Sequence, residues 1–264
     1  IRTHLAEPPG NRPATDDGPW LARLEQRYVA SPFWYHRIPL RSNIETPGWA
    51  PLNPEAYDLP ARMDGLRVLD VGAWDGYWTF EALRRGAREV VAIDDLSDGL
   101  GVAADIPWRN WENFDVCREA LGFDESVCKR YTMSVYDVVE ATLGRFDVIF
   151  LFGVFNQLRH PLLGLERLAA VCDGSLHVEA AIADNFSPYR GGIGGGYPNG
   201  QMLIEYYANA ELGNAVENRW APTLHALGAM LQTVGFNRIE GWKFSDAPSR
   251  QYLCRGIVRG DRVG

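Results

Sequence analysis

Short apolar runs alternate with stretches of helical periodicity from Gly65 onward, and this alternation constrains the fold more than any other feature of the chain. Five apolar runs have the length and composition of strands, and apolar residues at helical spacing lie between them. The runs are LRVLDV, EVVAID, VCKRYTM, FDVIFLF and SLHVEAA. The chain then ends in FNRIEGWKF and QYLCRGIVR, which the turn sequence SDAPS joins as an antiparallel pair. We therefore predict an α/β, Rossmann-like fold with a seven-stranded, mostly parallel sheet and a C-terminal antiparallel hairpin.

The residues before this alternation, residues 1–64, form a different kind of segment. The first ~15 residues are rich in proline and are expected to form a tail. A helix is predicted next, with Asp17 as its cap, and an aromatic, proline-rich arm follows up to residue 64. Residues 65–264 are expected to form the main domain, with a glycine-rich insertion near residues 186–200. The backbone freedom of those glycines predicts a mobile cover over the acceptor site, and a disordered connector is the alternative.

The charge balance narrows the classes of partner. A net charge of −8 and a pI near 5.2 argue against a nucleic-acid partner, because proteins that wrap a phosphate backbone carry a basic face. No apolar run reaches the ~20 residues that a membrane span needs, and the polar start IRTHLAEPPGNRP does not resemble a secretory signal. The four cysteines lack CxxC spacing, which favours buried thiols in a reducing compartment. We expect a cytoplasmic protein without a membrane partner, and a homodimer is left open.

The segment VLDVGAWDGYWTF, from Val68 to Phe80, predicts the chemistry of the ligand. A dinucleotide site uses three glycines so that backbone amides meet an anionic pyrophosphate. Here Asp70 stands where the first glycine of that pattern would be. Gly72 is followed by Ala73, so the G-x-G part of the pattern is absent, and the next glycine is Gly76. S-adenosyl-L-methionine carries an ammonium group and a sulfonium centre instead of phosphate, so a carboxylate at this strand end complements it. The segment therefore favours the cationic cofactor.

A second carboxylate follows at the tip of the next predicted strand. EVVAIDD places Asp94 where it can accept both ribose hydroxyls of an adenosyl group, with Asp95 beside it. Either pattern occurs by chance, and a strand-ending aspartate is often a helix cap. The two patterns in register with the predicted strands indicate a class I methyltransferase.

The chain resembles one methyltransferase family in particular, the family that contains the tRNA wobble-uridine-5-oxyacetate methyltransferases and small-molecule relatives. The resemblance runs from Trp34 to Ile257 and rests on WYHRIPL with TPGW, VLDVGAWDGYWTFEALRRGA, FDVIFLFGVFNQLRHPLLGLERLA, and ELGNAVENRWAP before AMLQTVGF. It implies that Asp70, Gly72 and Gly76 line the methionine end of the cofactor and that Asp94 holds the ribose. The resemblance also places five further residues around the adenine: Ser134, Val135, Tyr136, Phe152 and Gly153.

The departures from the family bear on the acceptor. Members usually read G-V-L-Y-H-L-R-H-P where this chain has Asn156 and Gln157 in place of the tyrosine and histidine. Amides hold a hydroxyl group but cannot take its proton at neutral pH, so a general base must come from elsewhere. The second tryptophan of the family's N-W-W motif is replaced by Arg219, which is either a contact for an anionic or polyhydroxylated acceptor or a solvated surface residue. The expected substrate-binding residues are Trp34, His36, Asn156, Gln157, Tyr207, Glu211, Asn218, Arg219 and Trp220.

The candidate general bases are His160 and Glu179. His160 follows the fourth predicted strand, where class I enzymes present groups to the acceptor, but it also precedes Pro161 at a helix start. His36 belongs to the aromatic arm, where packing of a lid competes with chemistry as its role. Glu179, Asp184 and Asn185 supply oxygen atoms near one sheet edge, so magnesium is a candidate cofactor there, although scattered carboxylates are usually solvated.

These observations predict an S-adenosyl-L-methionine-dependent methyltransferase that acts on a small molecule, with a hydroxyl of a saccharide or another polyhydroxylated metabolite as the expected acceptor. Two alternatives are kept. One is a tRNA-modifying methyltransferase. The other is a module that binds the cofactor without catalysis. This second alternative stays open because Asn156 and Gln157 replace the family's tyrosine and histidine.

Overall fold

The structure is a computed structural model that describes residues 18–30, 34–50, 52–97 and 110–263. The chain divides into two compact units. Unit 1 comprises residues 1–96 and 104–132, and unit 2 comprises residues 97–103 and 133–264. The predicted aromatic arm therefore shares a unit with the first three strands. Asp17, the predicted helix cap, lies outside the described residues.

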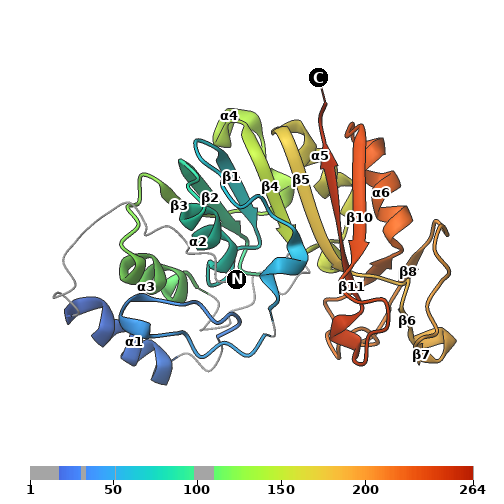
Figure 1. Ribbon diagram of the computed structural model, residues 1–264, viewed down its shortest axis with the longest axis horizontal. Coiled ribbons are helices and arrows are strands. Elements are labelled where there is room, and N and C mark those ends of the chain that lie inside the picture. Colours follow the sequence, from blue (N-terminus) through green and yellow to red (C-terminus); the bar gives the residue numbers. More distant parts are fainter. Residues whose placement is uncertain (1–17, 31–33, 51, 98–109, 264) are drawn as a thin grey trace. The chain divides into compact units, whose positions relative to one another are not determined.

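The main sheet has seven strands, in the order β1-β2-β3 within unit 1 and β10-β11-β5-β4 within unit 2 (Figure 1). Its strands are β1 (Arg67–Val71), β2 (Glu89–Asp94), β3 (Cys128–Thr132), β4 (Phe146–Phe152), β5 (Cys172–Ala181), β10 (Arg238–Lys243) and β11 (Arg255–Asp261). Strands β1, β2 and β3 pair in parallel, and so do β4 and β5. Strand β11 runs antiparallel to both β5 and β10. The predicted seven-stranded, mostly parallel fold with a C-terminal hairpin is confirmed.

Unit 1 places helices beside its three parallel strands. Its helical segments are α1 (Gly18–Ala30), η1 (Arg41–Asn43), η2 (Pro54–Tyr57), α2 (Tyr77–Arg84) and α3 (Glu112–Leu121). Helix α1 lies along α3, as Figure 1 shows, because its apolar face is buried and its Arg27 Nε donates to Asn113 Oδ1 over 3.0 Å. Trp20 and Leu24 form that buried face at helical spacing. The N-terminal helix is thus part of the folded unit.

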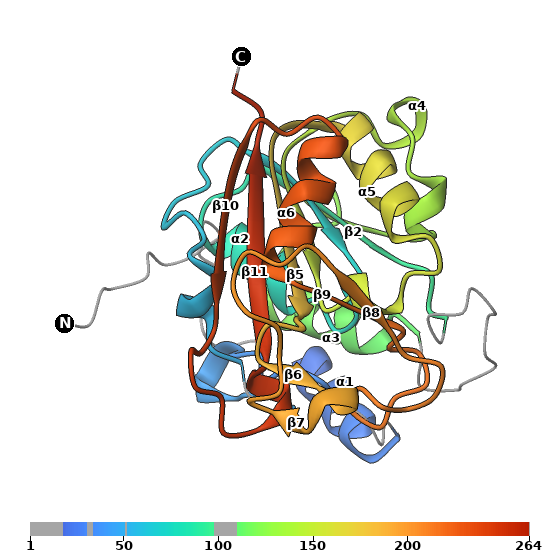
Figure 2. The same ribbon diagram turned by 90° about the vertical axis from the view of Figure 1, so that its right-hand side faces the viewer.

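Unit 2 contains the other four strands of the sheet and two small hairpins. Its helical segments are η3 (Val135–Asp137), α4 (Glu140–Leu143), η4 (Phe155–Gln157), α5 (Pro161–Ala170), η5 (Pro188–Arg190), α6 (Leu224–Thr233) and η6 (Gln251–Leu253). Helix α6 packs against β10 and β11, and Figure 2 shows it alongside these strands. The side chain of Thr223 caps α6 by accepting the amide N–H of Ala226.

Two features of unit 2 differ from the sequence prediction. QYLCRGIVR was predicted as one strand, but Gln251–Leu253 forms the 3₁₀ turn η6 and β11 begins only at Arg255. The hairpins β6 (Phe186–Ser187) with β7 (Gly192–Ile193), and β8 (Ile204–Tyr206) with β9 (Trp220–Pro222), were not predicted. These strands have two or three residues each, too few to display a two-residue periodicity.

The glycine-rich insertion is a folded hairpin. A side chain at Gly195 would lie 2.2 Å from the carbonyl oxygen of Arg190, and one at Gly196 would lie 2.2 Å from that of Asp184. Glycine is required at both positions because other segments of backbone approach so closely. These close approaches explain two of the glycines, and the role of the segment as a mobile cover stays a prediction.

All four cysteines are buried free thiols. Burial raises the pKa of Cys117 well above its ordinary value and that of Cys128 to about 12. No described helix has both the length and the hydropathy to cross a bilayer.

Candidate functional site

The turn between β1 and α2 forms the centre of the candidate site in unit 1. The amides of Gly72 and Ala73 both donate to the carbonyl oxygen of Ile93 at the end of β2, over 2.8 and 3.2 Å. Gly76 precedes α2 with φ of +91°, and a Cβ atom at this position would lie 2.6 Å from the rings of Phe114 and Phe80. The turn is therefore fixed by the second strand on one side and by the packed rings on the other.

Asp70 lies inside the sheet below this turn. Its side chain is buried, and Thr79 Oγ1 donates a hydrogen bond of 2.6 Å to Asp70 Oδ2. Burial raises the pKa of Asp70 to about 6, which the hydrogen bond from Thr79 and the charge of His36 partly oppose. A cation near this carboxyl group would favour its ionised form.

Asp94 ends β2 with its carboxylate held by two backbone amides. Trp74 N–H donates to Oδ2 over 3.1 Å, and Leu96 N–H donates to Oδ1 over 2.8 Å. These two amides, from either side of the strand end, orient the carboxylate. Trp74 has φ of +51°, a left-handed conformation that is uncommon for a tryptophan. Asp95, the next residue, is partly exposed.

Asp75 is a site residue that the sequence analysis missed. It lies within the same turn and is fully buried. Its Oδ2 accepts the amide N–H groups of Tyr35 and His36 over 3.1 and 2.8 Å, and its Oδ1 contacts His36 Nδ1. An acidic residue between the two glycines of the turn was the available signal, but nothing local to it indicated a partner in the arm.

The arm is held around His36 by a compact turn. Thr46 Oγ1 donates to the His36 carbonyl oxygen over 2.6 Å and accepts the amide of Ile38 over 2.8 Å. The Tyr35 ring meets the rings of Trp49 and Trp74 at centroid distances of 5.4 and 6.3 Å. Trp34, predicted to bind substrate, is buried in the core of the structure.

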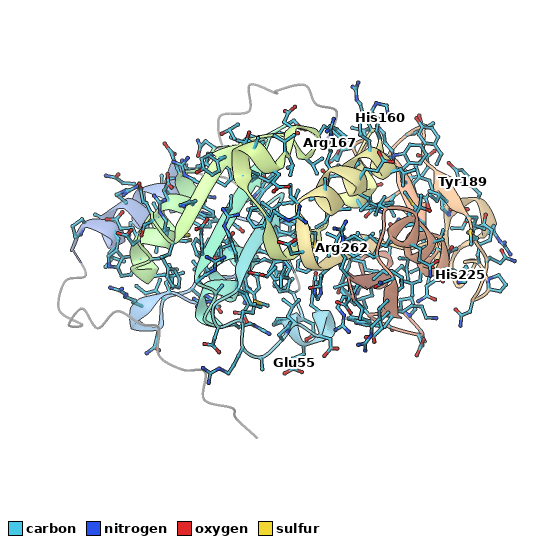
Figure 3. The ribbon with its side chains drawn as sticks, turned by 90° about the horizontal axis from the view of Figure 1, so that it is seen from above. Glu55, His160, Arg167, Tyr189, His225 and Arg262 are labelled. Carbon is cyan, nitrogen blue, oxygen red and sulfur yellow. The ribbon has the colours of Figure 1, made fainter. Side chains whose placement is uncertain are left out.

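The predicted adenine residues of unit 2 form the turn η3 after β3. Ser134 precedes this turn and its hydroxyl group accepts the amide N–H of Tyr136 over 3.4 Å, while Val135 is buried. The hydroxyl oxygen of Tyr136 accepts the amide of His160 over 3.0 Å. The imidazole of His160 is exposed at the start of α5, as Figure 3 shows, and does not cap the helix.

Phe152 and Gly153 end β4 as predicted. The Phe152 ring is buried and stacks on Phe150 at 4.9 Å, and the amide of Gly153 donates to the carbonyl oxygen of Glu179 over 3.2 Å. The carboxylate of Glu179 is buried and receives two hydrogen bonds from the guanidinium of Arg255, one of them 3.0 Å long. Both carboxylate oxygens of Glu179 are thus engaged by the guanidinium of Arg255.

Asn156 has a structural role in place of the predicted substrate contact. Its side chain is 2% exposed, its Nδ2 donates to the carbonyl oxygens of Ala181 and Trp220, and its Oδ1 accepts the amide of Ala181. Because backbone groups occupy the amide on both sides, we remove Asn156 from the proposed substrate contacts. Gln157 Nε2 makes one long hydrogen bond of 3.4 Å to the Gly153 carbonyl oxygen and is partly exposed.

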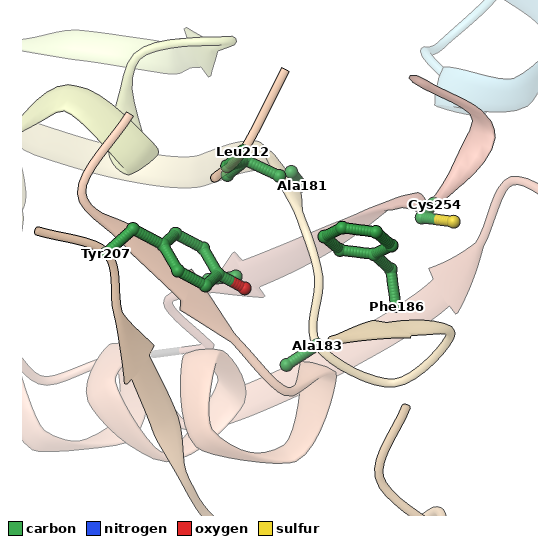
Figure 4. Packing of buried hydrophobic residues seen from close by; sticks show 7 residues of the cluster. Ala181, Ala183, Phe186, Tyr207, Leu212 and Cys254 are labelled. Atoms are coloured by element: carbon green, nitrogen blue, oxygen red, sulfur yellow. The ribbon is translucent and has the colours of Figure 1, made fainter. Parts of the chain in front are cut away.

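A buried carboxylate in β8 organises the two small hairpins. Glu205 accepts hydrogen bonds from the hydroxyl groups of Ser187, Tyr197 and Tyr207, over 2.6, 2.8 and 2.8 Å. Figure 4 shows the Tyr207 ring in the apolar cluster that also contains Phe186. Tyr207 is fully buried, so its predicted contact with substrate is replaced by this network. Burial and the neighbouring carboxylate raise the pKa of Tyr207.

The remaining predicted substrate residues lie near the surface of unit 2. Glu211 accepts hydrogen bonds from Asn209 and from the hydroxyl group of Tyr189. Asn218 Nδ2 donates to the Leu212 carbonyl oxygen over 3.2 Å, and Trp220 Nε1 donates to that of Leu158 over 2.6 Å. The guanidinium of Arg219 is partly exposed and has no ion pair with a carboxylate among the described residues.

The three residues considered for magnesium do not form a common site. Glu179 binds Arg255, Asp184 accepts the amide of Leu224, and Asn185 binds Ser245 and Lys243. The described part of the chain contains no group of three or more histidine, cysteine, aspartate or glutamate side chains that could hold a metal ion.

Sequence comparison finds distant relatives and no matching family model. A tRNA U34 carboxymethyltransferase of Dichelobacter nodosus is 28% identical over 129 residues, which are 48% of this chain and 36% of that protein. The Pseudomonas fluorescens protein of the same name is 24% identical over 183 residues, 67% of this chain and 47% of that protein. The chain thus spans half or less of the length of these relatives.

Structural comparison shows the class I methyltransferase fold. The N-terminal domain of EvdMO1, crystallised in the presence of SAH and D-fucose, superposes with a TM-score of 0.59 at 16% identity, over 92% of this chain and 97% of that chain. An S-adenosylmethionine-dependent methyltransferase from Mesorhizobium loti superposes with a TM-score of 0.53 at 15% identity, over 78% of this chain and 94% of that chain.

Proposed function

We propose that the chain is an S-adenosyl-L-methionine-dependent methyltransferase that transfers a methyl group to a hydroxyl of a saccharide or another polyhydroxylated small molecule. The observation that carries the proposal is the fixed carboxylate of Asp94 beside the turn from Gly72 to Gly76. Two backbone amides orient this carboxylate at the tip of β2, where a carboxylate can accept hydrogen bonds from the two hydroxyls of a ribose. The fold similarity and the distant relatives support the same class of enzyme.

The residues of unit 1 fit the cofactor. Gly76 adopts a backbone conformation that favours glycine. A positive charge near the carboxyl group of Asp70 would favour the ionised form of that group. When bound, S-adenosyl-L-methionine supplies a methyl group on a positively charged sulfur. The chain's part is to orient this group and the acceptor, since near-attack positioning supplies roughly 7 to 11 kcal/mol of a barrier.

The expected acceptor is polyhydroxylated for two reasons. The structurally similar domain of EvdMO1 was crystallised in the presence of D-fucose. In unit 2, the half-exposed rings of Tyr189 and Tyr206 and the guanidinium of Arg219 provide the stacking faces and hydrogen-bond donors that sugars use. A tRNA acceptor is the second candidate, because the relatives found by sequence bear that name. The net charge of −8 argues against it.

Calorimetry and a methyl-transfer assay test this proposal. Wild-type protein should bind S-adenosylhomocysteine, and Asp94→Ala should raise the dissociation constant roughly tenfold to hundredfold, because a charge-assisted hydrogen bond is worth about 1.5 to 3 kcal/mol. The exposed variant Asp246→Asn serves as the control for loss of one carboxylate.

Methyl transfer from tritiated cofactor would then be measured with D-fucose, other monosaccharides, phenols and bulk tRNA. Labelling of a sugar supports the proposal, and labelling of tRNA alone would replace its acceptor. Binding without transfer to any acceptor would favour a module that binds the cofactor without catalysis. Unchanged affinity in folded Asp94→Ala would remove Asp94 from the ribose role.

A further inference from the structure

We propose that His36 accepts the proton from the acceptor hydroxyl and that Asp75 positions it for this role. The inference rests on the proposed methyltransferase function and deepens it, because it assigns the general base that Asn156 and Gln157 cannot provide. It is carried by the geometry of the two buried side chains within unit 1.

Asp75 fixes which nitrogen of His36 is free. Its Oδ2 is occupied by the amides of Tyr35 and His36, so only Oδ1 faces the imidazole. A carboxylate accepts hydrogen bonds, so the neutral ring must carry its proton on Nδ1. The lone pair of Nε2 is then available, and no described residue has a hydrogen bond to that atom.

The position of the pair connects it to the proposed cofactor site. Asp75 lies one residue before Gly76, in the turn that precedes α2. His36 is close enough to Asp70 for the protonated form of its ring to lower the pKa of that carboxyl group. The aromatic neighbours of the imidazole are Tyr35 and Tyr77, at centroid distances of 4.7 and 5.3 Å. The side chain of His36 is 9% exposed, so the protein itself shields the imidazole from most of the solvent.

The other candidate bases of the described chain are less suited. Glu179 is committed to Arg255, and the exposed rings of His160 and His225 have no carboxylate that fixes their tautomer. His177 is buried in β5, and burial together with Arg259 lowers its pKa to about 3. The pair of His36 and Asp75 combines burial, a defined tautomer and a place beside the glycine turn.

The proposed step transfers one methyl group and one proton. As the acceptor oxygen bonds to the methyl carbon, the carbon–sulfur bond breaks and its electron pair remains on sulfur. The hydroxyl proton moves to His36 Nε2, and the imidazolium that forms lies against the negative charge of Asp75. The proton then passes to solvent and restores the neutral ring.

Nitrogen-15 NMR of histidine-labelled protein at pH 8 tests the inference without an acceptor. We expect His36 to show protonated Nδ1 and unprotonated Nε2, and its Nε2 signal to shift when S-adenosylhomocysteine binds. In Asp75→Asn, the side-chain oxygen is needed to accept the backbone N–H groups of residues 35 and 36. The side-chain NH₂ group therefore faces the imidazole of His36. The expected result is a change to the Nε2-protonated tautomer, which removes the lone pair that the proposed base needs.

The second measurement is the turnover of an acceptor that the wild-type protein is found to methylate. His36→Gln should lower turnover roughly 100-fold to 10,000-fold, the usual range for a positioned base, and leave the dissociation constant of S-adenosylhomocysteine within about threefold. His225→Gln, an exposed histidine in α6, is the matched control and should retain turnover. His36→Gln also serves if Asp75→Asn does not fold.

The outcomes separate the two proposals. Absence of S-adenosylhomocysteine binding by wild-type protein would refute the proposed function. Binding with His36 protonated on Nε2, doubly protonated at pH 8, or unaffected by the ligand would overturn the inference alone. Near-normal turnover of folded His36→Gln would do the same.

Discussion

Replacement of Asp70 by asparagine should make the protein more stable at neutral pH while weakening its cofactor site. The wild-type carboxyl group is 1% exposed, and burial raises its pKa from the ordinary 3.8 to about 6. Asparagine has nearly the same shape and its side-chain oxygen can still accept the hydrogen bond from Thr79 Oγ1. It does not carry the charge that burial disfavours.

The sign and size of the effect follow from proton linkage. Below pH 3.8 the carboxyl group is protonated in both the folded and the unfolded chain, so its pKa shift affects the free energy of unfolding little. Between pH 3.8 and about 6 the unfolded chain ionises first, and the folded state loses stability as the pH rises. At about 1.36 kcal/mol for each pH unit, the full loss is on the order of 3 kcal/mol above pH 6. Relaxation of the buried site reduces the measured value to about 1 to 3 kcal/mol.

Urea unfolding of both proteins at pH 4 and pH 8, without ligand, measures this difference. We expect the stability gained by Asp70→Asn to be at least about 1 kcal/mol larger at pH 8 than at pH 4. Asp246→Asn removes a carboxylate from the surface and serves as the control for net charge. An advantage of Asp70→Asn that is equal at the two pH values, or absent at both, would show that burial of this charge is not what shifts its titration.

Three further substitutions test other parts of the structure. Gly76→Ala should lower the free energy of unfolding by about 2 to 4 kcal/mol, because the added Cβ would lie 2.6 Å from two phenylalanine rings and φ is +91°. Thermal unfolding measures this loss, and a loss below about 1 kcal/mol would contradict the tight packing. Glu205→Ala should speed trypsin cleavage after Arg190, because three hydroxyl groups lose their shared acceptor, and Glu205→Gln should be cleaved at an intermediate rate. Cleavage of wild-type protein and Glu205→Ala at equal rates would show that the hairpin does not depend on Glu205. His160→Ala should leave turnover within about threefold and stability within about 0.5 kcal/mol, since its ring is exposed, whereas a loss of turnover of 100-fold or more would make His160 the base.

Several features of the protein could be predicted from the sequence because they depend on neighbours in the chain. The apolar runs at β2 and β4 have the predicted bounds, Glu89–Asp94 and Phe146–Phe152, because a strand buried on both faces has a continuous apolar sequence. The glycine turn and the carboxylate of Asp94 follow from strand ends and from turn chemistry. Parallel pairing follows from the intervening helices.

The tertiary structure decided which polar side chains are available for chemistry. Asp75 and His36 are 39 residues apart, and Asn156 binds backbone groups 25 and 64 residues away. Such pairs depend on the path of the folded chain, which periodicity and spacing do not specify. The side chains of Asn156 and Tyr207, which the sequence predicts as substrate contacts, bind other groups of the protein because an unpartnered buried polar group costs free energy. The sequence by itself thus determined the sheet and the cofactor turn, whereas long-range hydrogen bonding decided which residues remain for the reaction.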